Sequence, residues 1–351
     1  MRIIHCADIH LDSSLNTHLT IKQATIRKNE ILNTFYRMTV FAKENDVKNV
    51  LIAGDLCDEE SVTKSTIDLL FSFIKETSNI DYFYVPGNHD EKCYGLLEDK
   101  PDNFYVFTKK WQTAKYQDIT ISSTILHDGM YEELPVLSKD KYNIVMLHGD
   151  ISNRNDANYI HLDLLRNRNI HYLALGHIHS YMQNKLDYTG VYAYSGCLEG
   201  RGFDELGPKG FVVIDTETKK YNFHQLTNRE VIEQEINLSD TTSEVAALKK
   251  IENEINLIDK DNIFRLILKG DINYNYDNLE ERLHSLYSNK FFYFETKIFL
   301  HEKIDIENLK KGVSLKSEFF KIVDEDKNTS KEDKEEIYNL AMNLFNGEEI
   351  N

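Results

Sequence analysis

Short, mainly apolar runs recur along the first 220 residues, and each is closely followed by Asp, Asn or His. Runs of four or five such residues with Gly or Asp beside them are typical of buried strands. Five of these runs lie at 3–7, 50–53, 82–85, 144–147 and 172–175. The pattern therefore predicts strands whose ends carry polar side chains.

Helical spacing separates the first three runs. Apolar residues stand at 31, 35, 38 and 42, and again at 67, 70, 71 and 74. Strand, helix and strand in alternation predict a layered α/β domain, and such sheets place their sites at the carboxyl ends of the strands. Later runs at 192–194 and 211–214 are expected to complete the sheets.

After residue 220 the pattern changes and predicts a smaller β-α-β-α-β unit. Residues 230–238 read as a strand, and Thr241 with Glu244 reads as a capping box before a helix over 245–257. Phe264, Leu266 and Leu268 alternate as in a strand. A helix over 277–287 and a strand over 291–300 follow.

The segment 303–351 is charged and carries two apolar stripes with helical spacing. The stripes are Leu315, Phe319 and Ile322, flanked by Phe320 and Val323, and then Ile337, Leu340, Ala341, Leu344 and Phe345. Thr329 and Glu332 read as a capping box, and Gly347 stands where the second helix should end. Because short helices are marginal alone, each stripe must be buried, either on its own domain or on a partner.

Composition narrows the class of protein. A length of 351 residues suggests about two domains, and 41 basic against 58 acidic residues give a net charge of −17. Because nucleic-acid binders usually rely on basic surface, metal ions or a partner would have to supply positive charge if the substrate is DNA. The chain has neither an apolar run long enough to span a membrane nor a signal peptide, so we expect a cytoplasmic protein. Four widely spaced cysteines, without a C-x-x-C pair, predict reduced and buried thiols.

Side chains that bind metals gather where the predicted strands end. Seven are of ligand type, namely Asp8, His10, Asp55, Asn88, His148, His177 and His179. Carboxylate, imidazole and amide donors without thiolate suit Mn²⁺, Fe²⁺ or Zn²⁺. Seven ligands are too many for one ion. Two ions roughly 3.5–4 Å apart and bridged by a carboxylate would use them, and such a pair is suited to in-line displacement at phosphorus.

The order D-x-H, G-D, G-N-H-D, H and G-H-x-H resembles the calcineurin-like metallophosphoesterase superfamily over about residues 6–180. The resemblance implies an α/β fold, a layered β-sandwich flanked by helices, with a small α+β capping domain and C-terminal helices. Segments 4–13 and 194–201, the latter leading to 209–211, resemble the SbcD/YhaO type of DNA repair exonuclease. On this basis we expect a nuclease domain over 1–220, a capping domain over 221–302 and a partner-binding helical segment over 303–351.

The resemblance also implies roles for residues. One ion would be held by Asp8, His10, Asp55 and His179, and the other by Asp55, Asn88, His148 and His177. Mn²⁺ is the ion first expected, with Fe²⁺, Zn²⁺ and Mg²⁺ as alternatives. His89 would protonate the leaving alkoxide or steady the charged phosphorane, and Asp90 would orient its ring. Asp58 stands where some members carry His, and we interpret it as lying behind the ligands or as a simple turn carboxylate.

The function implied is a two-metal DNA phosphodiesterase in DNA repair, an exonuclease that could also cut as an endonuclease. Its expected partners are DNA and an SMC-like ATPase held through the C-terminal helices, with a homodimer inside the complex and no membrane. A phosphomonoesterase or cyclic-nucleotide phosphodiesterase would use the same metals. The missing signal peptide disfavours a secreted nucleotide hydrolase, and the intact set of ligands disfavours a non-catalytic scaffold.

Overall fold

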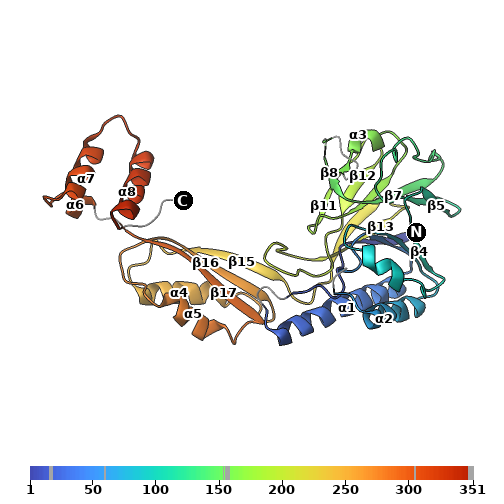
Figure 1. The fold of residues 1–351 in the computed structure, drawn as a ribbon, viewed down its shortest axis with the longest axis horizontal. Coiled ribbons are helices and arrows are strands. Elements are labelled where there is room, and N and C mark those ends of the chain that lie inside the picture. Colours follow the sequence, from blue (N-terminus) through green and yellow to red (C-terminus); the bar gives the residue numbers. More distant parts are fainter. Residues whose placement is uncertain (16–18, 59–60, 153, 155–158, 304–305, 347–351) are drawn as a thin grey trace. The chain divides into compact units, whose positions relative to one another are not determined.

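Figure 1 shows the computed structural model, which describes residues 1–15, 19–58, 61–152, 154, 159–303 and 306–346. By its internal contacts the chain divides into two units. The first consists of Met1–Glu233, Asp259–Arg265 and Tyr287–Phe294, and the second of Gln234–Ile258, Leu266–Leu286 and the described part of 295–351. The domain boundaries expected after residues 220 and 302 stay predictions.

The first sheet of unit 1 has the strand order β14-β13-β1-β2-β3-β4. Its strands are β1 (Arg2–Cys6), β2 (Val47–Ala53), β3 (Asp81–Val85), β4 (Phe104–Val106), β13 (Gly210–Asp215) and β14 (Lys220–Gln225). The first four run parallel, whereas β13 pairs antiparallel with β1 and β14 antiparallel with β13. Cys6 pairs with Ile52 and Ala53 with Val85, so the segments that follow these strands leave the same edge.

The second sheet has the order β11-β12-β10-β7-β6-β5. It is formed by β5 (Gln112–Lys115), β6 (Ile119–Ser123), β7 (Tyr142–His148), β10 (Tyr172–Gly176), β11 (Met182–Lys185) and β12 (Val191–Tyr194). The four central strands are parallel, and the two edge strands are antiparallel to their neighbours. His148 pairs with Gly176, which brings the ends of β7 and β10 together.

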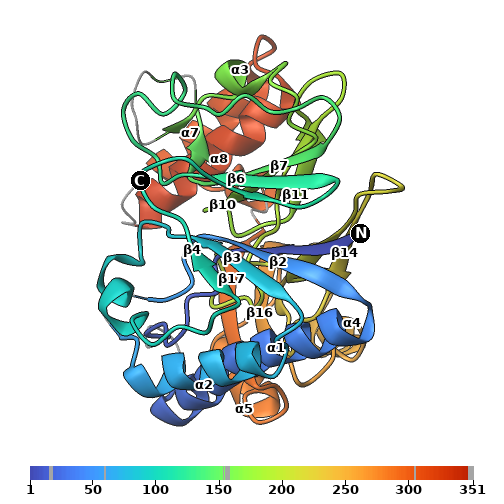
Figure 2. The same cartoon turned by 90° about the vertical axis from the view of Figure 1, so that its right-hand side faces the viewer.

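The two sheets pack face to face over an apolar core. Leu51 and Phe83 of the first sheet belong to the same buried cluster as Ile144 and Ala174 of the second. Helices α1 (Ile21–Glu44) and α2 (Lys64–Lys75) cover the outer face of the first sheet, as Figure 2 shows. The apolar positions predicted for both helices are buried there, because their 3.6-residue spacing gives each helix one apolar side. Strand, helix and strand alternate as predicted.

Another buried cluster covers the outer face of the second sheet. It joins Val145 and Leu173 to loop residues and to three short elements. These are β8 (Asp150–Ile151), β9 (Tyr159–Ile160) and α3 (Leu162–Leu165). Both sheets thus have covered faces, and the predicted fold class, a mixed α/β sandwich with flanking helices, is confirmed.

A third sheet, of order β15-β16-β17, follows. Its elements are β15 (Val231–Asn237), α4 (Glu244–Ile255), β16 (Ile263–Ile272), α5 (Leu279–Tyr287) and β17 (Tyr293–Glu302), in the predicted β-α-β-α-β order. Figure 1 shows α4 and α5 on one face of this sheet. The predicted capping box is wrong. Ser243 caps α4 by accepting the Ala246 N–H, whereas the Thr241 hydroxyl donates to the carbonyl of Leu238.

The C-terminal segment forms α6 (Ile306–Leu309), α7 (Leu315–Glu325) and α8 (Lys331–Asn346). Phe320 of α7 is buried against Tyr338 and Ala341 of α8. Of the stripe predicted for α7, Phe319 is partly buried against the same cluster, whereas Leu315 is 83% and Ile322 65% accessible.

The end signals predicted for α8 have different outcomes. The Ser330 hydroxyl accepts the Asp333 N–H, so the cap lies one residue beyond the predicted Thr329. Gly347, the predicted end signal, lies outside the described residues. Within the described part of the chain, no helix is both long and apolar enough to cross a membrane.

The cysteines correct one prediction. Cys57, just after β2, forms a disulfide with Cys93 in the 3-10 helix η1 (Glu91–Leu96). The two residues lie 36 positions apart, and they meet because both follow neighbouring parallel strands. Cys6 and Cys197 are free and buried, as expected.

Candidate metal centre

The candidate ligands meet where five parallel strands end. Asp8 and His10 follow β1, Asp55 follows β2 and Asn88 follows β3. His148 is the last residue of β7, and His177 and His179 follow β10. Side chains from the two sheets thus converge at one edge of the sandwich.

One group of potential ligands consists of Asp8, His10 and His179, with one donor atom of each within 4.8 Å of the others. The Nε2 atoms of His10 and His179 are 3.4 Å apart. Asp8 and His10 are buried, whereas His179 is half-buried. The trio is the set that the resemblance implied for the first ion, apart from Asp55.

The second group consists of Asp55, His148 and His177, again within 4.8 Å. Asn88 joins it, because its Oδ1 lies 3.1 Å from His148 Nε2. Asp55 Oδ2 is 3.3 Å from His148 Nε2 and 3.7 Å from His10 Nε2. It therefore lies between the two groups, the place expected of a bridging carboxylate.

The backbone at this edge is bent into unusual conformations. Asp8, His10, Asp55 and His177 all have positive φ, between 48° and 104°. Left-handed backbone in residues other than Gly clusters at functional sites because surrounding contacts must hold it. Here the Asp8 carboxylate accepts the His177 N–H at 2.9 Å, and the His10 N–H donates to the Asp55 carbonyl.

Gly54 allows the His148 ring to lie against the strand end that carries Asp55. Its φ is +91°, and a Cβ atom at this position would lie 1.9 Å from Nδ1 of His148. A side chain would thus displace the imidazole, which explains why the run before Asp55 ends in glycine.

Burial and mutual charge set the protonation of the ligands. Burial raises the pKa of Asp8 to about 6. Burial also acts to raise the pKa of Asp55, but the hydrogen bond and charge of His148 hold it well below its usual range. Burial and the positive charge of Arg201 lower the pKa of His10 to about 3, so that its ring is neutral at pH 7.

His148 has the opposite shift. Burial acts to lower its pKa, but the hydrogen bond and charge of Asp55 outweigh burial and raise it to about 9. Without a metal, His148 and Asp55 therefore form a buried ion pair. A metal ion bound here would replace the proton of His148.

The residues fit a dinuclear metal centre. Metal-binding histidines usually donate their other ring N–H to a carbonyl or carboxylate behind them. His148 Nδ1 lies 2.9 Å from the Ala53 carbonyl, and His179 Nδ1 lies 2.7 Å from Glu205 Oε1. Both rings thus direct Nε2 into the site. The mixed nitrogen and oxygen donors suit Mn²⁺, Fe²⁺ or Zn²⁺.

His89 lies at the exposed rim of the site. Its backbone N–H donates to Asp55 Oδ1 at 3.0 Å, and its ring centre is 5.2 Å from that of His10. The side chain is therefore accessible to a substrate while its backbone is tied to the central carboxylate.

Asp90 differs from the expected role of orienting the His89 ring. Its buried carboxylate accepts the backbone N–H groups of Leu56, Cys57 and Gly87 at 2.7–3.3 Å. These bonds join the loops after β2 and β3. Asp90 thus holds the loop that carries Asn88 and His89, which is a structural task.

Asp58 is half-buried, and its charge acts on the guanidinium group of Arg201. It belongs to neither group of potential ligands. Arg201 and Glu205 contact His179 and so belong to this site, although neither was predicted from the sequence as part of it. Segment 194–201, which contains Arg201, carries only a resemblance to DNA repair exonucleases.

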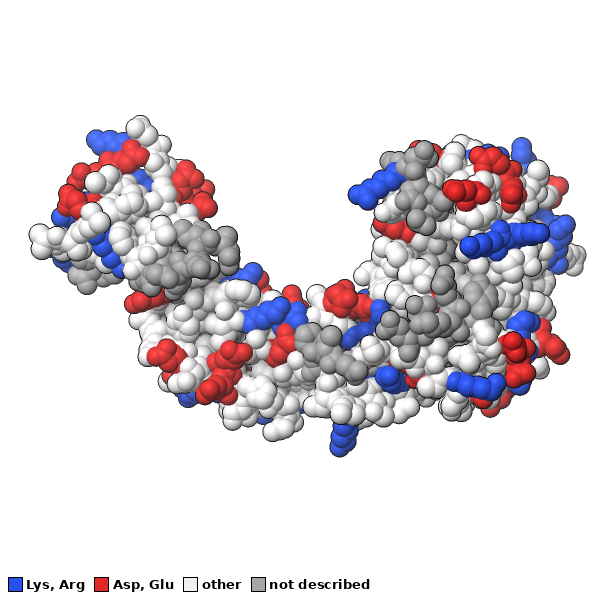
Figure 3. All heavy atoms as spheres, viewed as in Figure 1, with Lys and Arg blue, Asp and Glu red and all other residues white. Residues whose placement is uncertain are grey.

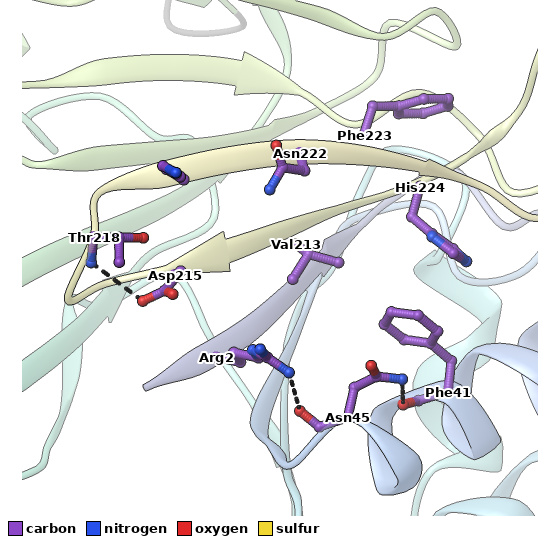
Figure 4. A pocket seen from close by; sticks show the side chains of 10 residues that line it. Arg2, Phe41, Asn45, Val213, Asp215, Thr218, Asn222, Phe223 and His224 are labelled. Atoms are coloured by element: carbon purple, nitrogen blue, oxygen red, sulfur yellow. Dashed lines mark hydrogen bonds between the residues drawn. The ribbon is translucent and has the colours of Figure 1, made fainter.

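A separate cavity of about 300 Å³ lies away from these residues (Figure 4). Strands β1, β13 and β14 and the end of α1 line it, with Arg2, Asp215 and His224 among its side chains. The candidate ligands do not line this cavity, so we do not assign the chemistry to it.

The family model for the calcineurin-like phosphoesterases matches residues 1–181. Among solved structures, the protein TT1561 of Thermus thermophilus matches at 11% identity over 64% of this chain and 98% of that one, with a TM-score of 0.43. A dimetal phosphatase from Danio rerio matches at 11% identity over 61% and 91%, with a TM-score of 0.42. A purple acid phosphatase from yellow lupin seeds matches at 12% identity over 64% and 52%, with a TM-score of 0.42. Because all three TM-scores are below 0.5, the family of this chain is assigned from the family model alone.

Proposed function

The chain belongs to the calcineurin-like phosphoesterase family, and from that premise we propose that it is a metal-dependent nuclease that hydrolyses phosphodiester bonds in DNA. One observation carries the proposal: two groups of potential ligands face each other with Asp55 between them. Two ions bridged by a carboxylate suit in-line displacement at phosphorus. We expect the seven ligands named above to hold two divalent ions, with Mn²⁺ first.

Such ions would polarise the phosphate and lower the pKa of a bound water molecule. The residues of the chain would bind the ions, position the loop of His89 and supply a proton. Neutral His10 keeps a lone pair for binding, and Asp55 fixes the backbone of His89. From the exposed rim, the His89 ring would donate a proton to the leaving alkoxide.

Two features favour DNA over a small phosphoester. Segments 4–13 and 194–201 resemble DNA repair exonucleases, and a second unit follows the catalytic one. The net charge of −17 disfavours binding to the anionic DNA backbone. Figure 3 shows acidic and basic side chains interspersed among the described residues of the face drawn. A partner would then contribute positive surface for the DNA backbone.

The C-terminal helices are proposed to bind that partner, an SMC-like ATPase in a DNA repair complex that contains two copies of this chain. The supporting observation is exposed apolar surface. Leu315 and Ile322 of α7 and Leu344 of α8 are 83%, 65% and 61% accessible. Amphipathic helices of this kind dock into grooves or onto coiled coils through such side chains.

The competing function is a phosphomonoesterase or a cyclic-nucleotide phosphodiesterase. To separate them, the purified chain with Mn²⁺ is given linear DNA, p-nitrophenyl phosphate and cyclic AMP, and the Asp55→Asn variant serves as the control for metal-dependent turnover. We expect DNA to be degraded fastest. Faster release of p-nitrophenol or hydrolysis of cyclic AMP would contradict the proposal.

A further inference from the structure

A buried carboxylate lies directly behind one of the candidate ligands. Glu205 is 2% exposed, and its Oε1 is 2.7 Å from Nδ1 of His179. On the far side of the ring, His179 Nε2 faces His10 Nε2 at 3.4 Å. Glu205 therefore contacts the ring nitrogen that points away from the proposed ions.

A guanidinium group competes for the same nitrogen. Arg201 Nη2 lies 3.2 Å from His179 Nδ1 and 2.6 Å from Glu205 Oε1. Its Nε and its backbone N–H also donate to the Glu205 carboxylate, at 3.0 and 2.7 Å. His179 Nδ1 thus has an acceptor and a donor beside it, and the acceptor is nearer.

These two neighbours favour different tautomers of the neutral ring. Beside a carboxylate, Nδ1 keeps the proton and Nε2 offers its lone pair to the site. If the guanidinium donated to Nδ1 instead, the proton would have to reside on Nε2, where it would point at His10 and block binding of an ion.

We propose that Glu205 is a positioning residue that holds the proton of His179 on Nδ1 against the competing donor Arg201, and so keeps Nε2 free to bind a metal ion. The inference rests on the metal centre of the proposed function, but it does not depend on which phosphoester is the substrate. Glu205 also orders Arg201, which brings positive charge close to His10.

Another carboxylate of the same segment provides a matched control. Glu199 is 3% exposed and bonds to Arg27 at 2.9 Å and Thr34 at 2.6 Å. It belongs to neither group of potential ligands. Replacing Glu199 perturbs a buried network that is built on Arg27, Thr34, Thr227 and Asn228 rather than on His179.

The first test measures the affinity of each site for Zn²⁺ and Mn²⁺ by competition with a chromophoric chelator. Glu205→Ala should weaken one of two sites by about 10–100-fold, the usual effect of losing a residue behind a ligand. The double variant Arg201→Ala/Glu205→Ala should regain part of this affinity, because no donor then competes for Nδ1. Glu205→Gln, which keeps an acceptor oxygen, should retain most of it, and Glu199→Gln should bind as the unchanged chain does.

A purely structural role would not produce the recovery in the double variant. The proposal would be overturned if Glu205→Ala and the double variant bound metal equally weakly at this site. It would also be overturned if Glu205→Ala kept the metal affinity of the unchanged chain. If Glu205→Ala does not fold, Glu205→Leu takes its place, because leucine is of similar size but offers no acceptor. Loss of one site in Glu205→Leu but not in Glu205→Gln supports the role, and equal affinities in these two variants refute it.

A second readout needs neither metal nor substrate. Ring ¹H–¹⁵N spectra of the metal-free protein, recorded where the imidazole is neutral and assigned with His179→Gln, report which nitrogen carries the proton. We expect Nδ1–H in the unchanged chain and Nε2–H in Glu205→Ala. The same tautomer in both would overturn the proposal. If DNA is not the substrate, these results stand, whereas an unchanged chain that binds only one ion would refute the dinuclear centre itself.

Discussion

Replacing Asp55 tests the dinuclear arrangement most directly. Asp55 Oδ2 lies 3.3 Å from a nitrogen of one ligand group, on His148, and 3.7 Å from a nitrogen of the other, on His10. Its second oxygen accepts the His89 N–H. Asp55→Ala therefore removes a ligand atom from both sites and the hydrogen bond that anchors the loop of His89, whereas loss of His10 or His177 affects one site only.

The size of the effect follows from the position of this carboxylate. Loss of a group that only supports a ligand lowers metal affinity by about 10–100-fold, so loss of a direct carboxylate ligand should exceed about 100-fold at each site. If the two losses act independently, activity at a fixed and limiting Mn²⁺ concentration should fall by about 10⁴-fold or more. Asp55→Asn, which keeps the shape but not the charge, should fall between Asp55→Ala and the unchanged chain.

The assay is metal content after dialysis, measured by plasma mass spectrometry, together with turnover on DNA. We expect about two ions in the unchanged chain, about one in His10→Ala or His177→Ala, and close to none in Asp55→Ala. Asp58→Asn is the matched control, because Asp58 lies three residues away and is not a potential ligand. Two firmly held ions in Asp55→Ala, or equal losses in Asp58→Asn, would refute the bridging assignment.

Four further results are expected. His89→Ala should keep both ions but lose about 10²–10⁴-fold in turnover, and loss of metal would make His89 a ligand instead. The folded-state pKa of His148 is raised from 6.5 to about 9, so its contribution to the stability of the metal-free protein is complete below pH 6.5 and lost as pH rises through 9; melting temperatures should fall over that range, and less so in His148→Asn. The double variant Cys57→Ser/Cys93→Ser removes a disulfide that joins residues 36 positions apart, and it should lower the free energy of unfolding in urea by about 4 kcal/mol. Identical unfolding curves for the variant and the unchanged chain would show that the disulfide does not form. Deleting residues 313–351 should spare Mn²⁺-dependent cleavage of short single-stranded DNA and abolish co-purification with the ATPase, and a truncated chain that still holds its partner would contradict the docking proposal.

The sequence predicted most of the elements around the centre because periodicity is a local property. The helical spacing at Ile31 and Phe35 specified one buried side of α1, and the structure has it. The candidate ligands could be found for a related reason. Parallel strands end at the same edge of a sheet, so polar residues that directly follow them lie close together at that edge.

What the sequence did not reveal depends on long-range contacts or on ambiguous periods. Glu205 lies 26 residues after His179, and nothing in its local pattern separates it from the many other acidic residues of the chain. The disulfide between Cys57 and Cys93 could not be predicted for the same reason, because it joins residues 36 positions apart. In α7, Phe319 and Phe320 are neighbours about 100° apart around the helix, so two apolar faces compete. Phe320 is buried against α8 and Phe319 is partly buried there, whereas Leu315 and Ile322 are exposed.

The bent backbone of the site relates its chemistry to stability. Asp8, His10 and Asp55 each hold a left-handed conformation, which costs about 1–3 kcal/mol per residue relative to ordinary backbone. The metal-free centre also keeps two carboxylates buried, and the raised pKa of Asp8 shows that burial disfavours its charge. The packed core between the two sheets must offset both of these unfavourable contributions to stability. A bound ion stabilises the folded state by about 2.7 kcal/mol when its free concentration is 100 times its Kd, so two ions would offset much of this cost. The same bends that destabilise the chain aim its ligands at one point, which is why metal binding and the stability of this edge must rise and fall together.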